Sequence, residues 1–301
     1  METKASPMSI AAGESAENGA APGRPLEIEA PSNRYLIHPA SRRVAEWLES
    51  TPATPNQVSI ASVFASGLAA AAYVGLAWPW NAFVGLAFQF AWHVLDGADG
   101  DLARRTGRAS PLGELVDGVC DHLSQALIYV AFAIVLQRSL GGWAWAAASG
   151  AGASHFVQAN AYETGRKAYR HFVYGAPWMR QTGAGASVPA AALSSFYLAV
   201  SSLSSPGELK VGLAMETAAA AGRGAEARRR YRERFAPLVK ASGVLDSNTR
   251  TLAIFLAVLA GSPLWFFVFE LTALNVAFVA LALLRGRANR DLARDLEAAG
   301  G

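Results

Sequence analysis

Four aspartates with regular spacing stand between two apolar stretches of this chain. They are Asp96, Asp99, Asp117 and Asp121, in the segment LDGADGDLARRTGRASPLGELVDGVCD that covers residues 95–121. Ionised carboxylates at the ends of apolar helices are costly unless an opposite charge cancels them. Two divalent cations would cancel all four charges. Oxygen ligands favour Mg²⁺, Mn²⁺ or Ca²⁺ over structural zinc, and paired metals are a recurrent device for phosphoryl displacement.

The spacing of the aspartates predicts how helices would present them. Asp96 and Asp99 are three residues apart, and Asp117 and Asp121 are four apart, so each pair shares one face of a helix. The link over residues 105–112 contains a glycine and a proline and can reverse the chain. We therefore expect two helices side by side, with all four carboxylates converging at their ends.

The composition indicates that these helices belong to a membrane protein. Hydrophobic residues make up 52% of the 301 residues and charged residues 16%, against about 25% in soluble chains. A membrane helix needs about 20 mostly apolar residues. The predicted spans therefore cover residues 57–78, 80–101, 115–137, 142–164, 248–262 and 264–284. The chain has a single cysteine, Cys120, and so can form no internal disulfide.

The distribution of basic residues predicts the orientation of these spans. With six spans, both termini lie on one side of the membrane, and of the 26 lysines and arginines only Arg138 falls on the other. Because cytoplasmic loops carry the excess of Lys and Arg, the side with the termini is predicted to be cytoplasmic. In a bacterium this would be the inner membrane. The net charge of +3 then reflects topology and contact with anionic lipids, and nothing indicates nucleic acid.

The predicted fold is an all-α integral membrane protein with six transmembrane helices, an N-terminal interfacial amphipathic helix and a cytoplasmic helical insertion. The insertion includes a weak further span candidate at 186–203. The expected segments are a disordered cytoplasmic tail (1–32), the amphipathic helix (33–52), the first four spans with the aspartates (53–182), the insertion (183–247), the last two spans (248–285) and a cytoplasmic tail (286–301).

Written out, the aspartate segment reads D-x-x-D-G-x-x-A-R-x8-G-x-x-x-D-x-x-x-D from Asp96 to Asp121. At every fixed position this resembles the signature of the CDP-alcohol phosphatidyltransferase family. The resemblance implies a donor that is a CDP-linked alcohol, usually CDP-diacylglycerol, bound through its pyrophosphate to two cations, Mg²⁺ or Mn²⁺. It further implies that the hydroxyl of a small polar alcohol attacks the lipid-side phosphorus and that CMP leaves.

The resemblance also assigns roles, position by position. Asp96, Asp99 and Asp117 match metal ligands, and Asp121 matches an aspartate that both touches a metal and removes the acceptor proton. Three of the remaining matched positions lack side-chain bulk, which lets a nucleotide approach the backbone. The predicted nucleotide-binding residues are Gly100, Ala103, Arg104 and Gly113, with Pro55 and Asn56 from the segment TPNQVS at the start of the first span.

The end of the fourth span carries polar residues that could bind the acceptor. His155, Gln158, Tyr162 and Arg166 follow one helix face, which we expect to line a polar pocket. Family members with phosphorylated acceptors often show a Y-x-K-A-R-A-E-like stretch here. This chain matches its Tyr and Arg but has Thr164 where that stretch has Lys, which argues against a phosphorylated acceptor.

Two other functions compete with a lipid-synthesising transferase. A divalent-cation transporter would place its acids near the bilayer midplane in broken helices, whereas these lie at helix ends beside small residues and Arg104. A catalytically inactive scaffold would tolerate the loss of motif aspartates, and all four are present. The identity of the acceptor alcohol stays open, and a homodimer is implied by the resemblance alone.

Overall fold

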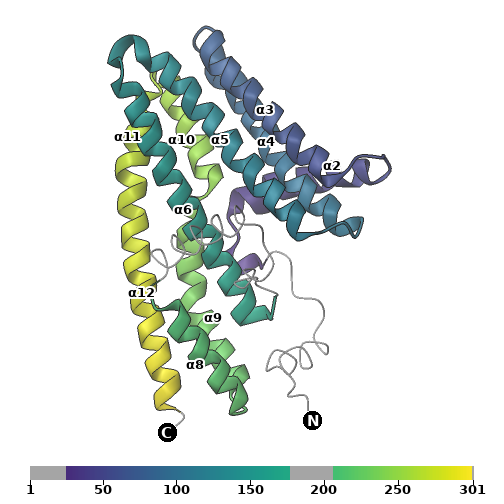
Figure 1. The fold of residues 1–301 in the computed structure, drawn as a ribbon, viewed down its shortest axis with the longest axis vertical. Coiled ribbons are helices and arrows are strands. Elements are labelled where there is room, and N and C mark those ends of the chain that lie inside the picture. Colours follow the sequence, from purple (N-terminus) through teal and green to yellow (C-terminus); the bar gives the residue numbers. More distant parts are fainter. Residues whose placement is uncertain (1–24, 177–205, 300–301) are drawn as a thin grey trace, which may run out of the picture. The chain divides into compact units, whose positions relative to one another are not determined.

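The computed structural model describes residues 25–176 and 206–299, which form helices and connecting turns with no β-strand among them (Figure 1). Residues 1–24 of the predicted disordered tail (1–32) and the span candidate 186–203 lie outside the described residues, whereas residues 25–32 are described and include η2 (Leu26–Ile28). The chain divides into two compact units. We call residues 30–156 and 245–276 the aspartate unit, and the described residues of 1–29, 157–244 and 277–301 the α8–α9 unit.

The aspartate unit contains the helices that carry the motif. Its core is aromatic, with Phe132, Phe266 and Phe267 almost fully buried beside Tyr129. Its elements are η3 (Asn33–Ile37), α2 (His38–Glu49), α3 (Pro55–Gly75), α4 (Trp80–Arg105), α5 (Pro111–Leu140), the first part of α6 (Trp143–Tyr174), α10 (Ser247–Leu259), α11 (Leu264–Phe269) and η5 (Glu270–Leu274).

Local sequence fixes where the motif helices begin. Thr54 caps α3 by accepting a hydrogen bond from the backbone N–H of Gln57, while the Gln57 side chain accepts one from the backbone N–H of Thr54. Ser110 caps α5 by accepting from the backbone N–H of Gly113. Such caps satisfy N–H groups that the first helical turn leaves without a partner.

The α8–α9 unit has a core of its own. Tyr169, Tyr231, Phe235 and Leu292 are each at most 3% exposed, and the rings of Tyr231 and Phe235 stack with centroids 4.2 Å apart. Its elements are η2 (Leu26–Ile28), the second part of α6, α8 (Glu208–Ala220), α9 (Gly224–Ala241) and most of α12 (Asn275–Ala298); η4 (Ser242–Leu245) follows α9. Residues 208–245 are thus mainly helical, as the sequence predicts for this part of the insertion.

Among the described residues, three helices are long and apolar enough to cross a membrane: Pro55–Gly75, Leu112–Leu140 and Leu264–Ala298. The third runs through α11, η5 and α12 and continues well beyond residue 284, where the predicted span ends. By contrast, α10 has 13 residues and, at about 1.5 Å per residue, is shorter than the roughly 30 Å hydrocarbon core.

The helix predicted upstream of the first span is present as η3 and α2. Tyr35, Leu36 and Trp47 are more than half exposed on it, whereas Ser41 and Ala45 are buried. The same element therefore has an inward face that packs on the protein and outward aromatic side chains. That it lies at a membrane interface stays a prediction.

Candidate metal and nucleotide site

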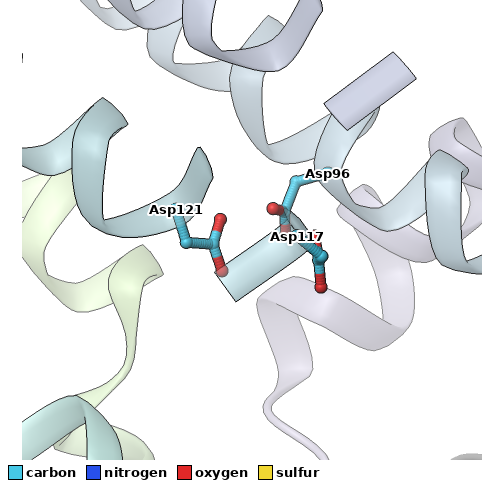
Figure 2. A group of neighbouring side chains, drawn as sticks. All are labelled: Asp96, Asp117 and Asp121. Carbon is cyan, nitrogen blue, oxygen red and sulfur yellow. The ribbon is translucent and has the colours of Figure 1, made fainter. Parts of the chain in front are cut away.

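Three of the four predicted aspartates converge at one point of the aspartate unit. Asp96 comes from α4, and Asp117 and Asp121 come from α5; one carboxylate oxygen from each lies within 4.8 Å of the other two. Figure 2 shows Asp121 extending toward Asp96, with Asp117 beside Asp96. Each side chain is partly buried, so the group is accessible and yet sheltered from bulk water.

The donor set fits a hard divalent cation. Oxygens on opposite sides of an ion lie about 4.2 Å apart around Mg²⁺ and about 4.6–5.2 Å apart around Ca²⁺. The limit of 4.8 Å on the oxygen separations lies inside the range for Ca²⁺ and exceeds the distance for Mg²⁺ by about 0.6 Å. The group has carboxylate oxygens alone, without thiol or imidazole, which is the ligand type that Mg²⁺, Mn²⁺ and Ca²⁺ prefer.

The fourth aspartate, Asp99, lies beside this group but is held separately. It is 4% exposed, and its Oδ2 accepts a hydrogen bond of 2.5 Å from the hydroxyl of Ser59 on α3. Asp99 is near enough to Asp96 and Asp117 for the carboxylates to repel one another. The four aspartates are carried by α4 and α5, and α3 holds one of them in place through Ser59.

The helix α2 supports the motif helix α4 from another side. The backbone of α4 approaches α2 so closely at Gly97 that a Cβ there would lie 2.5 Å from the Ser41 hydroxyl. Further along α4, Arg105 donates hydrogen bonds to Glu46 (2.7 Å) and Glu49 (3.1 Å) of α2. These contacts lie directly after Asp96 and on both sides of Asp99 along α4.

The predicted nucleotide-binding residues form two groups in the aspartate unit. On α4, the Arg104 guanidinium lies over Gly100, 3.4 Å from where a Cβ of that glycine would be, and it also pairs with Asp101. Ala103 lies on the same helix. At the start of α3 and α5, the Asn56 side chain lies next to Gly113, 3.7 Å from its would-be Cβ. Pro55 is the first residue of α3.

The predicted acceptor residues all lie on α6, but their surroundings differ. His155 is buried in the aspartate unit, where its Nδ1 shares a hydrogen bond of 2.7 Å with the Tyr129 hydroxyl. Gln158, Tyr162 and Arg166 belong to the α8–α9 unit. Gln158 is fully buried, and the guanidinium of Arg166 lies over the Tyr162 ring and pairs with the neighbouring Glu163 at 3.1 Å.

Sequence reasoning missed two polar contacts of the aspartate unit. One is the Ser59–Asp99 hydrogen bond; its only signal is that Ser59 ends the segment TPNQVS. The other is a fully buried ion pair in which Arg250 donates to both carboxylate oxygens of Glu270, at 3.0 and 3.2 Å. Its signal was an arginine and a glutamate inside stretches assigned to the membrane, where charged residues need a partner.

The Ser59 contact leads to a prediction about metal affinity. Ser59→Ala removes the hydroxyl that orients Asp99, a predicted ligand, and should weaken Mn²⁺ binding about tenfold or more, as loss of such supporting hydrogen bonds typically does. Ser59→Thr should restore the affinity. Electron paramagnetic resonance of free Mn²⁺ during titration of the purified protein measures this.

Ser62 provides the matched control for that experiment. It is an equally buried serine on the same helix, but its hydroxyl donates to the backbone carbonyl of Ser59 and not to a carboxylate. Ser62→Ala should leave the Mn²⁺ affinity unchanged. Equal affinities for wild type and Ser59→Ala would show that Ser59 does not support the metal site.

Comparison with known proteins agrees with this geometry. A family model described as CDP-alcohol phosphatidyltransferase matches residues 53–219, more than half of the chain. An uncharacterized CDP-alcohol phosphatidyltransferase class-I family protein of Dictyostelium discoideum is 48% identical over 61 residues, 20% of this chain and 14% of that protein. Cholinephosphotransferase 1 of Gallus gallus is 38% identical over 58 residues, 19% of this chain and 17% of that protein.

The chain thus aligns with less than a fifth of either relative's length. From the match over residues 53–219, the chain belongs to the CDP-alcohol phosphatidyltransferase family.

Proposed function

We propose that this membrane protein transfers a substituted phosphate group from a CDP-linked alcohol to the hydroxyl of a second alcohol and releases CMP. The observation that carries the proposal is the convergence of Asp96, Asp117 and Asp121 within 4.8 Å, with Asp99 held beside them by Ser59. A group of hard oxygen ligands is what binding of a metal–pyrophosphate requires.

The four aspartates would hold two divalent cations, Mg²⁺ or Mn²⁺. When bound, such ions neutralise the pyrophosphate and stabilise charge on the attacking and leaving oxygens. Asp96, Asp99 and Asp117 are proposed as ligands; the convergence of carboxylates from α4 and α5 supports this for Asp96 and Asp117, and Asp99 lies beside them. Asp121 is proposed both to touch a metal and to act as the base.

In the proposed reaction, Asp121 takes the proton from the acceptor hydroxyl. The acceptor oxygen forms a new bond to the donor phosphorus that carries the transferred group. The bond from that phosphorus to the oxygen of CMP breaks, and CMP leaves with the electron pair. The proton then passes from Asp121 to water, so atoms and charge balance. A positioned base of this kind typically contributes 10²–10⁴-fold.

The nucleotide is proposed to bind across the two groups of small and polar residues. Gly100, Ala103 and Gly113 leave room for it close to the backbone. Arg104 is more than half exposed despite its pairing with Asp101, so its guanidinium can also face phosphate. Pro55 and Asn56 would border the nucleotide from the start of α3, because the Asn56 side chain lies next to Gly113.

The acceptor is proposed to be an unphosphorylated polar alcohol bound by His155, Gln158, Tyr162 and Arg166. Arg166 already pairs with Glu163, which weakens it as a receptor for a phosphate group. This agrees with the threonine that stands at position 164 where relatives with phosphorylated acceptors have lysine.

Two pairings of donor and acceptor fit this chemistry. The first is CDP-diacylglycerol as donor with a small polar alcohol as acceptor. The similarity to a cholinephosphotransferase favours a second candidate, in which the small alcohol is on the CDP side and a lipid alcohol accepts it. The attack on phosphorus and the release of CMP are the same in both.

A crossed panel of substrates tests the proposal. Purified protein in lipid nanodiscs is given CDP-diacylglycerol with serine, inositol, glycerol or choline, or CDP-choline with diacylglycerol, and CMP is measured. We expect release only when donor and a suitable acceptor are both present. Absence of CMP release with every pair, together with ⁵⁴Mn²⁺ uptake into sealed proteoliposomes, would instead favour a transporter.

We also propose six spans, with the aspartates at the cytoplasmic membrane face. Five exposed tryptophans support this, because tryptophan gathers at membrane–water interfaces. The five lie at or beside the turns that follow α3, α5 and α10: Trp78, Trp80, Trp143, Trp145 and Trp265. Trp80 is on α4, and Asp96 follows it by sixteen residues, about 24 Å along the helix. That distance is most of the hydrocarbon thickness.

Accessibility of a single cysteine tests this orientation. Lys240 is exposed near the end of α9, and Lys240→Cys in a Cys120→Ala background should resist an impermeant maleimide in intact bacterial cells. The same residue should react in inverted vesicles. Labelling from outside would contradict cytoplasmic placement of α9 and of both termini.

A further inference from the structure

One face of α12 changes from exposed apolar residues to exposed arginines. Val279 and Leu283 are 53% and 61% exposed, and the arginines at 287, 290 and 294 continue the same face at spacings of four, three and four residues. The opposite side of the helix is buried, with Ala288, Leu292 and Leu296 at most 9% exposed. We call Arg287, Arg290 and Arg294 the α12 arginine stripe; α12 is the long yellow helix in Figure 1.

The arginines of the neighbouring segment α9 are arranged differently. Arg229 pairs with Glu226 and Glu233, and Arg230 pairs with Glu226 at 2.7 Å. Hydrogen bonds from Arg230 and Arg229 accordingly hold the pKa of Glu226 below its usual value. Arg234 pairs with Asp295 of α12. Much of the positive charge of α9 is therefore neutralised within the protein.

The α12 arginine stripe forms no ion pair with the part of the chain that the structure describes. Within residues 25–176 and 206–299, no carboxylate oxygen lies within 4.0 Å of a nitrogen of Arg287, Arg290 or Arg294. Two exposed acids lie on or beside this face, Asp291 four residues after Arg287 and Glu297 three residues after Arg294. Neither forms an ion pair with the stripe in the same part of the chain. The three exposed guanidinium groups therefore face outward and form no ion pair with the described residues.

We infer that the α12 arginine stripe binds the headgroups of anionic phospholipids. The exposed apolar residues that precede it on the same face belong to a helix apolar enough to cross a membrane, so lipid chains lie against them. Arg287 follows Leu283 by about 6 Å along the helix, and the headgroup layer of one leaflet is about 5–7 Å deep. With Leu283 at the edge of the hydrocarbon, the stripe would begin in the headgroup layer.

The order of the residues sets the expected contributions. Arg287 and Arg290 lie nearest the apolar part and should reach the phosphates directly. Arg294 lies about 10 Å beyond Arg287 along the helix. Only its long side chain can extend back to the phosphates, so it should contribute least to lipid binding. A lipid is the favoured occupant over a free anion because the apolar residues and the arginines form one continuous face, which acyl chains and phosphate occupy together.

Lipid retention by the intact protein tests the inference. Native mass spectrometry of the detergent-purified full chain, titrated with phosphatidylglycerol or phosphatidylcholine, gives the affinity for each lipid. The triple variant Arg287→Gln, Arg290→Gln, Arg294→Gln should bind phosphatidylglycerol about 10²-fold more weakly, since each basic residue contributes about fivefold near an anionic surface. Binding of phosphatidylcholine should not change, and Arg287→Gln alone should cost more than Arg294→Gln.

Two further variants separate a site from a general charge effect. Replacing the three arginines by lysine keeps the charge and should keep most of the selectivity. Replacing Arg228, Arg229 and Arg230 on α9 by glutamine removes the same formal charge and should have little effect. An equal loss in both glutamine variants, displacement of the lipid by millimolar inorganic phosphate, or unchanged binding in the α12 variant would each overturn the inference.

Discussion

Removal of divalent cations with EDTA is expected to abolish CMP release completely. Asp96, Asp117 and Asp121 present oxygens within 4.8 Å of one another, and Asp99 adds a fourth carboxylate that repels two of them. The pyrophosphate of a CDP-linked donor brings further negative charge to the same place. Without cations this arrangement repels the donor and leaves the developing charge on phosphorus without a counter-charge.

Restoration identifies the metal. Excess Mg²⁺ or Mn²⁺ should recover the activity of the chelated enzyme, and EGTA, which prefers Ca²⁺, should leave activity in Mg²⁺ buffer intact. Direct titration of the apo protein with Mn²⁺ provides a measurement that does not depend on turnover. Full activity in metal-free buffer would eliminate the proposed two-metal site.

Asp121→Asn is expected to lower turnover by about 10²-fold or more. The variant keeps the shape of the side chain and one oxygen that can face a cation, but the amide cannot accept the proton of the acceptor hydroxyl. Metal-dependent binding of the donor should therefore survive in part. Asp96→Asn should instead impair donor binding itself, because Asp96 is the contribution of α4 to the converging group.

The two effects are separated by measuring donor affinity with a fluorescent CDP-lipid and turnover by CMP release for each variant. Glu114→Gln is the matched control, since Glu114 is an exposed acid in the first turn of α5 and lies outside the converging group. Its activity should stay within about twofold of wild type, as for most surface changes. Near wild-type turnover of Asp121→Asn at saturating acceptor would show that Asp121 is not the base.

The sequence was informative about what lies on each helix and less so about what lies between helices. Helical spacing within α5 places Asp117 and Asp121 on one face, and they converge with Asp96 as expected. The Ser59–Asp99 hydrogen bond joins residues forty positions apart. Such a contact depends on how α3 packs against α4, which periodicity along one helix does not encode.

The sequence analysis predicted where the last span ends but not where the helix that contains it ends. Hydropathy falls at Arg285, where the prediction placed the end of the last span, yet α12 continues to Ala298. The continuation is rich in Ala, Arg and Leu, which are strong helix formers. Hydropathy indicates where a helix leaves an apolar environment, whereas propensity and packing decide where the helix itself ends.

The buried pair of Arg250 and Glu270 has a consequence for how the chain enters a bilayer during synthesis. Arg250 lies on α10 and Glu270 at the start of η5, after the tight turn near Gly261 and the short helix α11, and they are 1% and 0% exposed. Insertion of a lone arginine at the centre of a membrane helix costs about 2.5–3.5 kcal/mol, which is an upper bound for Arg250, the fourth residue of α10. If α10 entered by itself, this cost would be uncompensated until α11 and the start of η5, which carries Glu270, followed. If α10 and the segment with Glu270 enter together as a hairpin, the two charges enter the bilayer as a neutral pair. One ion pair would then decide whether these segments insert together or one after the other.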